Sequence, residues 1–88
     1  MRTLTELYEL VDAEQSAYTA LVRARRDGET AAKVRAAYER WGAALEQRNV
    51  ALRQYFSLAP DASVGAALTE VLLSRVSESK PRRRKTSR

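Results

Sequence analysis

Apolar residues recur at alternating spacings of three and four along most of the first 56 residues. This spacing places them on one face of an α-helix and leaves charged residues on the others. A third amphipathic stretch follows, and only three Gly and two Pro among 88 residues argue against a turn-rich β fold. We therefore predict an all-α protein with helices at about 3–26, 29–56 and 62–77.

Local signals set the expected ends of these helices. Thr3 or Thr5 is a suitable N-cap for the first helix. Asp27-Gly28 ends it, because glycine tolerates the left-handed backbone found after many helices. We place the second helix directly after this turn. Pro60 suits the first turn of the third helix, and Pro81 follows its end, since the residue before a proline avoids the helical region.

The first two helices carry heptad patterns of the coiled-coil type. The a and d positions are Leu4, Leu7, Val11, Glu14, Tyr18, Leu21 and Arg25 in the first, and Val34, Tyr38, Trp41, Leu45, Arg48, Leu52 and Tyr55 in the second. A short turn makes the helices antiparallel neighbours, and Tyr18 then meets Trp41. Glu14 and Arg48 fall in adjacent layers, within reach of an ion pair. We interpret this pair as fixing the register, because one carboxylate with one guanidinium is a poor catalytic pair.

Small residues beside this heptad pattern favour a third helix. Leu10, Ala17 and Ala24 line one helix there, and Ala37, Ala44 and Ala51 line the other, while the third helix offers Val64, Ala67, Leu68, Val71, Leu72 and Val76. We predict a three-helix bundle in residues 1–79. The third helix, roughly 25 Å long, is too short to cover a second helix of roughly 42 Å. Apolar surface near the turn is therefore expected to meet another subunit or a partner, through Val22, Val34, Tyr38 and Trp41. The aromatic residues as a group are expected to pack in or beside the core.

Gly42 interrupts the second helix without a turn signal around it. Glycine inside a helix costs roughly 1 kcal/mol relative to alanine. We expect a closely approaching neighbouring backbone to explain its presence.

Charge is distributed unevenly along the chain. Residues 1–79 carry ten Arg or Lys and eleven Asp or Glu, whereas residues 80–88 carry six Arg or Lys and no acid. We expect this basic tail to be disordered, because it has almost no apolar side chain to bury. Polyanions bind such segments by charge, and arginine pairs bidentately with phosphate. The candidate nucleic-acid-binding residues are Lys80, Arg82, Arg83, Arg84, Lys85 and Arg88. The alternatives are a solubilising tail and a tail that binds an acidic protein or a membrane surface.

A second basic cluster is expected at the turn between the first two helices. Its members are Arg23, Arg25, Arg26, Lys33 and Arg35, with Asp27 and Glu29 among them. One interpretation is charge compensation at helix ends. The other is a second surface that contacts phosphates.

The missing residue types exclude several classes of chemistry. The chain has no Cys and no His, which removes disulfides, thiolate and histidine catalysis, and histidine-containing metal sites. A glycine-rich phosphate loop is absent as well. From these absences together, we expect no catalytic residue, cofactor, metal or small-molecule substrate. The first fifteen residues contain no unbroken apolar stretch, and no run approaches the roughly 20 residues of a spanning helix. A cytoplasmic protein with no membrane partner is therefore expected.

These features favour a non-catalytic helical oligomerisation module that binds nucleic acid through its tail, with DNA as the expected partner and without sequence preference. Thirteen Arg against three Lys, and fifteen Ala, are typical of high-GC bacteria and their phages. A nucleoid- or virion-associated accessory or architectural protein is the resulting hypothesis. The alternative is a small structural or assembly protein, such as a phage particle or chaperone-like component, with an incidental tail. RNA or an acidic protein as the tail's partner, and the oligomeric state, stay open.

Overall fold

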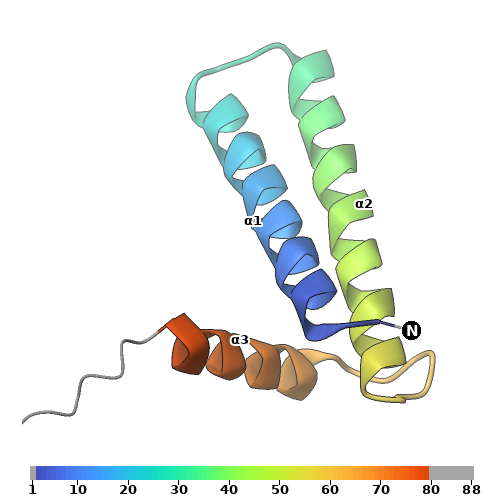
Figure 1. Cartoon of the computed structure of the whole chain (residues 1–88). Helices are drawn as coiled ribbons and strands as arrows, with labels where there is room; N and C mark the ends of the chain where they lie inside the picture. Colours follow the sequence, from blue (N-terminus) through green and yellow to red (C-terminus); the bar gives the residue numbers. More distant parts are fainter. Residues whose placement is uncertain (1, 80–88) are drawn as a thin grey trace, which may run out of the picture.

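The computed structural model describes residues 2–79, and every regular element in that range is an α-helix. The helices are α1 (Leu4–Arg26), α2 (Ala31–Tyr55) and α3 (Gly65–Ser79). The chain turns after α1 and α2 returns alongside it, whereas α3 lies across the end of this pair that is remote from the turn (Figure 1). The prediction of an all-helical bundle is confirmed. The prediction of a disordered tail concerns residues 80–88, which lie outside the described residues.

Both ends of α1 follow from local chemistry. The Thr3 hydroxyl accepts a hydrogen bond from the Glu6 backbone N–H at 3.1 Å, and the Glu6 carboxylate accepts one from the Thr3 N–H at 3.2 Å. This reciprocal capping box satisfies two backbone donors at the start of the helix. After the last turn, Gly28 adopts a φ of 71°, a left-handed conformation that costs glycine little.

α2 begins at Ala31, two residues later than the expected start at residue 29. Thr30 is its N-cap, because its backbone is extended and its hydroxyl accepts a hydrogen bond from the Lys33 N–H at 3.3 Å. A capping threonine stands immediately before the first helical turn. Glu29 therefore stays in the connection, where its carboxylate lies 3.6 Å from the Lys33 ammonium.

α3 begins at Gly65 rather than at residue 62, and Pro60 does not lie in its first turn. The connection before α3 is held by two hydrogen bonds to its neighbours. The Leu58 N–H donates to the Arg53 carbonyl at 2.8 Å, and the Arg53 side-chain Nε donates to the Ala62 carbonyl at 2.9 Å. These bonds hold residues 58–62 outside the helix, so Pro60 lies in the connection and not in α3.

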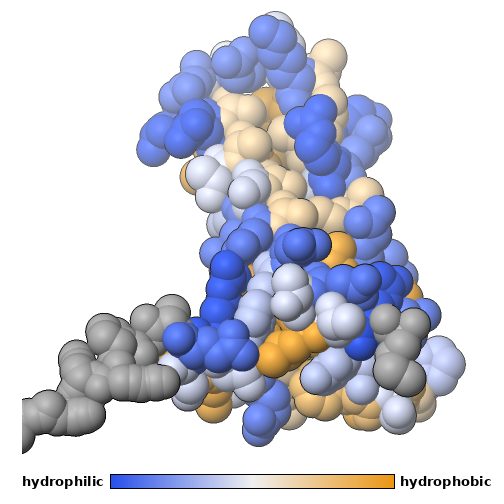
Figure 2. All heavy atoms as spheres, in the orientation of Figure 1, coloured by the Kyte–Doolittle hydropathy of each residue, from blue (hydrophilic) through white to orange (hydrophobic). Residues whose placement is uncertain are grey.

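The buried core lies where all three helices meet. Its fully or almost fully buried members are Leu7, Val11, Ala51, Leu52, Ala67 and Val71. Leu7 and Leu52 have no exposed area, so the first two helices are closely packed at this end. At the turn end of the pair, the buried residues are Ala17, Leu21 and Ala37, and two of these three have small side chains. One face of the molecule shows apolar residues continuing up its middle into this half, which α3 does not cover (Figure 2).

Arg75 determines which face of α3 turns inward. Its guanidinium makes a bidentate contact with the Asp12 carboxylate, at 2.6 and 2.8 Å, and lies 5.2 Å from the centre of the Tyr8 ring. Burial, followed by the charge of Glu78, raises the pKa of Tyr8 above its ordinary value of 10.0. These contacts join α3 to α1 and orient Val71 toward the core.

The same orientation turns other apolar residues of α3 outward. Leu72, Leu73 and Val76 are 38%, 58% and 55% exposed, and we call them the α3 ridge. Leu72 and Val76 were expected in the core, so that expectation is wrong for both. Residues 71–73 are all apolar, so periodicity alone does not show which of them faces the core. The contact of Arg75 with Asp12 of α1 turns Val71 inward and Leu72 and Leu73 outward.

Acidification is expected to weaken the contact between α3 and α1. The hydrogen bond from Arg75 lowers the pKa of Asp12 below its ordinary value of 3.8. A carboxyl group whose pKa is lowered by folding adds stability above its unfolded pKa and loses it as the pH falls through the folded value. Wild type should therefore exceed Asp12→Asn in stability above about pH 4. The difference in stability should be small, because both side chains are partly exposed. Urea titrations at lower pH should show no difference. A difference that persists in acid would contradict a stabilising ion pair.

Gly42 has no closely approaching neighbour, contrary to expectation. A Cβ atom built at this position meets no atom within 4 Å outside its own helix backbone. We therefore expect Gly42→Ala to raise the free energy of unfolding by roughly 1 kcal/mol, through helix propensity alone. Chemical denaturation measures this change. Gly28→Ala is the matched control, and it should lower stability because its φ of 71° is strained for alanine. Destabilisation by Gly42→Ala would show that the glycine is needed for packing.

Candidate functional site

An open groove lies between α1 and α2 beside the connecting turn, with a volume of about 1070 Å³. Its larger apolar lining residues are Tyr18, Leu21, Val34, Tyr38 and Trp41, and we call it the aromatic groove. Arg25, Arg35 and Glu39 supply the charges at its edge. The groove is thus mainly apolar with a basic border.

Three aromatic rings form the most prominent surface of the groove. The Tyr18 and Trp41 ring centres are 5.6 Å apart, and those of Tyr38 and Trp41 are 5.9 Å apart, both in tilted arrangements. The contact of Tyr18 with Trp41 across the two helices agrees with the predicted register. Such pairs contribute about 0.5–1.5 kcal/mol beyond their burial. The rings therefore hold one another in place before any partner arrives.

Two of these rings are far more exposed than the heptad pattern predicts. Tyr18 is 50% exposed and Tyr38 is 59% exposed, so both lie beside the core rather than in it. The exposure of Tyr38 agrees with the expectation that apolar surface near the turn stays uncovered. Small buried residues, Ala17 and Ala37, occupy the contact between the helices at this level. Because alanines let the two helices approach closely, the larger tyrosine rings lie at the border of that contact.

A hydrogen bond and an ion pair hold the third ring, that of Trp41, in position. The Trp41 indole Nε1 donates a hydrogen bond to Glu14 Oε2 at 2.8 Å. The other oxygen of this carboxylate, Oε1, lies 3.5 Å from Arg48, and the two charged side chains are only 13% and 12% exposed. Arg48 also donates to the Asn49 side-chain oxygen, at 2.8 and 3.1 Å. The ion pair is confirmed, and its role in orienting Trp41 is the part that sequence reasoning missed.

The five cations of the second basic cluster have three kinds of surroundings in the structure. Arg26 lies 3.7 Å from Asp27, and Lys33 lies 3.6 Å from Glu29, so these two cations compensate neighbouring acids. Arg25 and Arg35 instead line the aromatic groove. Arg23 borders a separate shallow hollow on α1. Of the five cations, only Arg25 and Arg35 therefore line the aromatic groove.

The remaining predicted site residues are placed as follows. Val34, Tyr38 and Trp41 line the aromatic groove, whereas Val22 is 42% exposed and does not line it. The tail residues Lys80, Arg82, Arg83, Arg84, Lys85 and Arg88 lie outside the described residues. The α3 ridge is a second exposed apolar surface that sequence reasoning did not identify.

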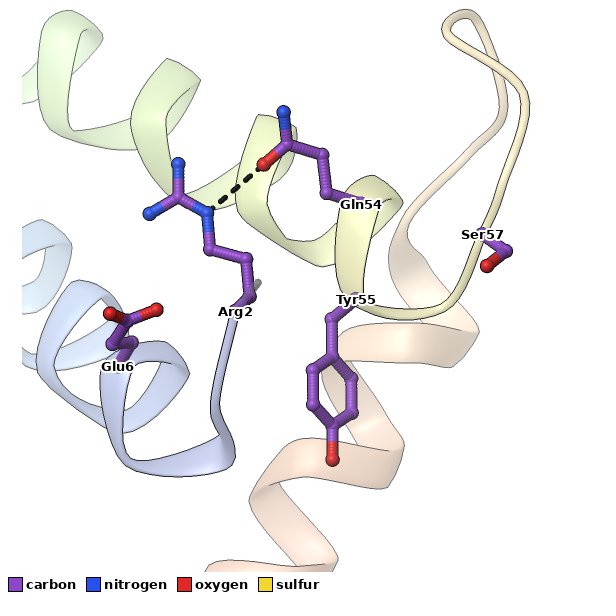
Figure 3. Close-up of a pocket in the computed structure, with 5 residues that line it drawn as sticks. All are labelled: Arg2, Glu6, Gln54, Tyr55 and Ser57. Atoms are coloured by element: carbon purple, nitrogen blue, oxygen red, sulfur yellow. Dashed lines mark hydrogen bonds between the residues drawn. The ribbon is translucent and has the colours of Figure 1, made fainter.

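A polar hollow near the N-terminus is formed by residues that hold the start of the chain against the end of α2. Figure 3 shows Arg2 and Glu6 on one side of it and Gln54, Tyr55 and Ser57 on the other. The Arg2 Nε donates to Gln54 Oε1 at 3.0 Å, which ties the start of the chain to the end of α2. Glu6 is already engaged in the capping box. These contacts explain the hollow without a ligand.

Residues 2–79 contain neither a candidate membrane span nor a candidate metal site. None of these helices combines the length and the apolar character that crossing a membrane requires. Within the same range, Asp and Glu side chains do not gather in groups of three or more that could hold a metal ion.

Comparisons with known proteins found no match among family models, curated proteins or solved structures.

Proposed function

We propose that this chain is a non-catalytic helical module that self-associates through its body and binds nucleic acid, most simply DNA, through its basic tail. The observation that carries the proposal is the aromatic groove, with Tyr18 and Tyr38 each at least half exposed. Exposed apolar clusters with basic borders are typical of interaction surfaces, where aromatic residues and arginine are enriched. The rings pack on one another in advance, which lowers the entropy cost of docking.

The open shape of the molecule supports association. The Cα radius of gyration is 16.4 Å, whereas a compact domain of this length has a value of about 12 Å. The buried core is confined to one end, and the other end exposes large apolar side chains. A partner that covers this end adds burial that the isolated chain lacks.

The nucleic-acid part of the proposal is supported by charge. The six cations of residues 80–88 face no acid in their own segment, and the rest of the chain has a net charge of −1. Attraction to a polyanion is therefore assigned mainly to the tail. This combination suits a DNA-associated accessory or architectural protein in the cytoplasm of a bacterium or in a phage.

The finer architecture is also part of the proposal. We infer that α1 and α2 pack as an antiparallel, coiled-coil-like hairpin. The contact of Tyr18 with Trp41 and that of Glu14 with Arg48 support this packing, because both join positions that the heptad patterns place in the same or adjacent layers.

The test is a titration of the protein with duplex DNA at several salt concentrations, with and without residues 80–88. Sedimentation velocity of the same samples without DNA measures self-association separately. Tight binding that requires the tail supports the nucleic-acid role, and failure of the intact chain to bind DNA or RNA at low salt contradicts it.

A structural or assembly role is the second candidate. It is favoured by the position of both exposed apolar surfaces, the aromatic groove and the α3 ridge, in the body rather than in the tail. Self-association without nucleic-acid binding would support this role over the first.

A further inference from the structure

α3 covers only part of one face of the α1–α2 pair. Val11 and Phe56 pack in the cluster that α3 completes. Tyr18 lies about two helical turns after Val11, and Tyr38 lies five turns before Phe56, so the tyrosines share the face on which α3 packs. α2 is roughly 37 Å long, whereas a helix that crosses it occupies about 10–12 Å. The aromatic groove therefore continues the surface that receives α3, and it has room for a second helix.

The α3 ridge is suited to that room. It is a convex helical surface formed by Leu72, Leu73 and Val76, whose exposures run from 38% to 58%. The molecule thus presents a concave apolar surface and a convex apolar surface at opposite ends. The groove of one molecule is out of reach of its own ridge, because α3 lies across the end remote from the turn (Figure 1).

The charges beside the two surfaces are complementary. Arg25 and Arg35 border the aromatic groove and have no ion-pair partner among residues 2–79. Glu70 is exposed on α3, close to the ridge in the helix, and likewise has no such partner. The edge of the groove also carries Glu39, so its net charge is +1. A ridge that enters the groove therefore brings a carboxylate toward a border in which two guanidinium groups outnumber one acid.

We propose that the α3 ridge of one molecule docks in the aromatic groove of a second copy, so that the chains associate head to tail. This inference rests on the self-association proposed above and specifies its geometry. Such a heterologous contact leaves one free groove and one free ridge on every open assembly. It therefore builds rings or open filaments rather than a closed two-fold dimer.

Two single substitutions and their mixture test the geometry. Tyr38→Glu places a charge in the groove, and Leu73→Glu places one on the ridge. Each full-length variant alone should associate at least about 30-fold more weakly than wild type, the factor expected for an interface residue worth 2 kcal/mol. Ala36→Glu is the matched control, because Ala36 is exposed on α2 but does not line the groove. It should assemble like wild type in sedimentation velocity.

The equimolar mixture is the decisive sample. The Tyr38→Glu chain keeps an intact ridge, and the Leu73→Glu chain keeps an intact groove, so the mixture should form a one-to-one dimer and nothing larger. This recovery also shows that both variants are folded. If Leu73→Glu alone still dimerises and the mixture adds nothing, the contact is groove to groove, which overturns the inference but retains self-association. A wild-type monomer at several hundred micromolar overturns both.

Discussion

Deleting residues 80–88 should remove most of the affinity of the protein for duplex DNA. Six cations that each contact a phosphate release condensed counterions, which gives the intact chain a log–log salt slope of at most roughly −5. Its affinity should then fall about a thousandfold between 50 and 200 mM salt. The truncated chain, with a net charge of −1, should bind weakly with a slope near zero. Fluorescence anisotropy at four or more salt concentrations measures both quantities.

Two controls separate the charge of the tail from its length and from the fold. A full-length variant with all six cations of the tail changed to Gln should behave like the truncated chain. Far-ultraviolet circular dichroism should be unchanged by the deletion, because α1, α2 and α3 end before residue 80. Unrelated DNA sequences should bind similarly, since phosphate contacts carry no base information. Retention of affinity and slope by the truncated body would contradict the tail's role and transfer it to Arg25 and Arg35.

Replacing Glu14 should have the largest effect on stability among the polar residues of the body. Glu14→Leu leaves the Arg48 charge largely buried and removes the acceptor of the Trp41 indole N–H. Breaking a fully buried ion pair from one side costs about 3–5 kcal/mol. We expect a loss near or below the lower value, because the Glu14–Arg48 pair is part-buried and Arg48 retains Asn49. A chain of this length has a total stability of roughly 4–13 kcal/mol, so the loss is a large share. Urea denaturation followed by Trp41 emission measures it.

The double variant Glu14→Leu with Arg48→Leu provides the internal control. Because both charges are removed together, its stability should return to within about 1 kcal/mol of wild type. Glu9→Leu, on an exposed position of α1, should change stability by less than about 0.5 kcal/mol. A Glu14→Leu chain as stable as Glu9→Leu would show that the network does not hold the helices together.

Local chemistry determines most of the helix boundaries. Thr3, one of two expected caps, and Gly28 after Asp27 mark the ends of α1 in the sequence and act as expected in the structure. Thr30 carries an equally readable cap signal, and the expected start at residue 29 overlooked it. Periodicity also places Tyr18 opposite Trp41 and Glu14 near Arg48. These features depend on neighbours within one or two helical turns, or on a short connection, so the sequence contains them.

The candidate site depends on contacts that periodicity does not specify. A heptad pattern shows which residues share a face, but Tyr18 and Tyr38 are exposed because no third helix reaches them. That outcome is decided by α3, which crosses the far end and is oriented by Arg75 on Asp12, 63 residues away along the chain. The same contact turns Leu73 outward and creates the ridge. The sequence by itself determined the helices, their caps and the basic tail, whose composition is independent of folding. The length of the third helix also indicated that the turn end stays uncovered. Only the tertiary structure decided which side of α3 faces outward, because that depends on a long-range contact between α3 and α1.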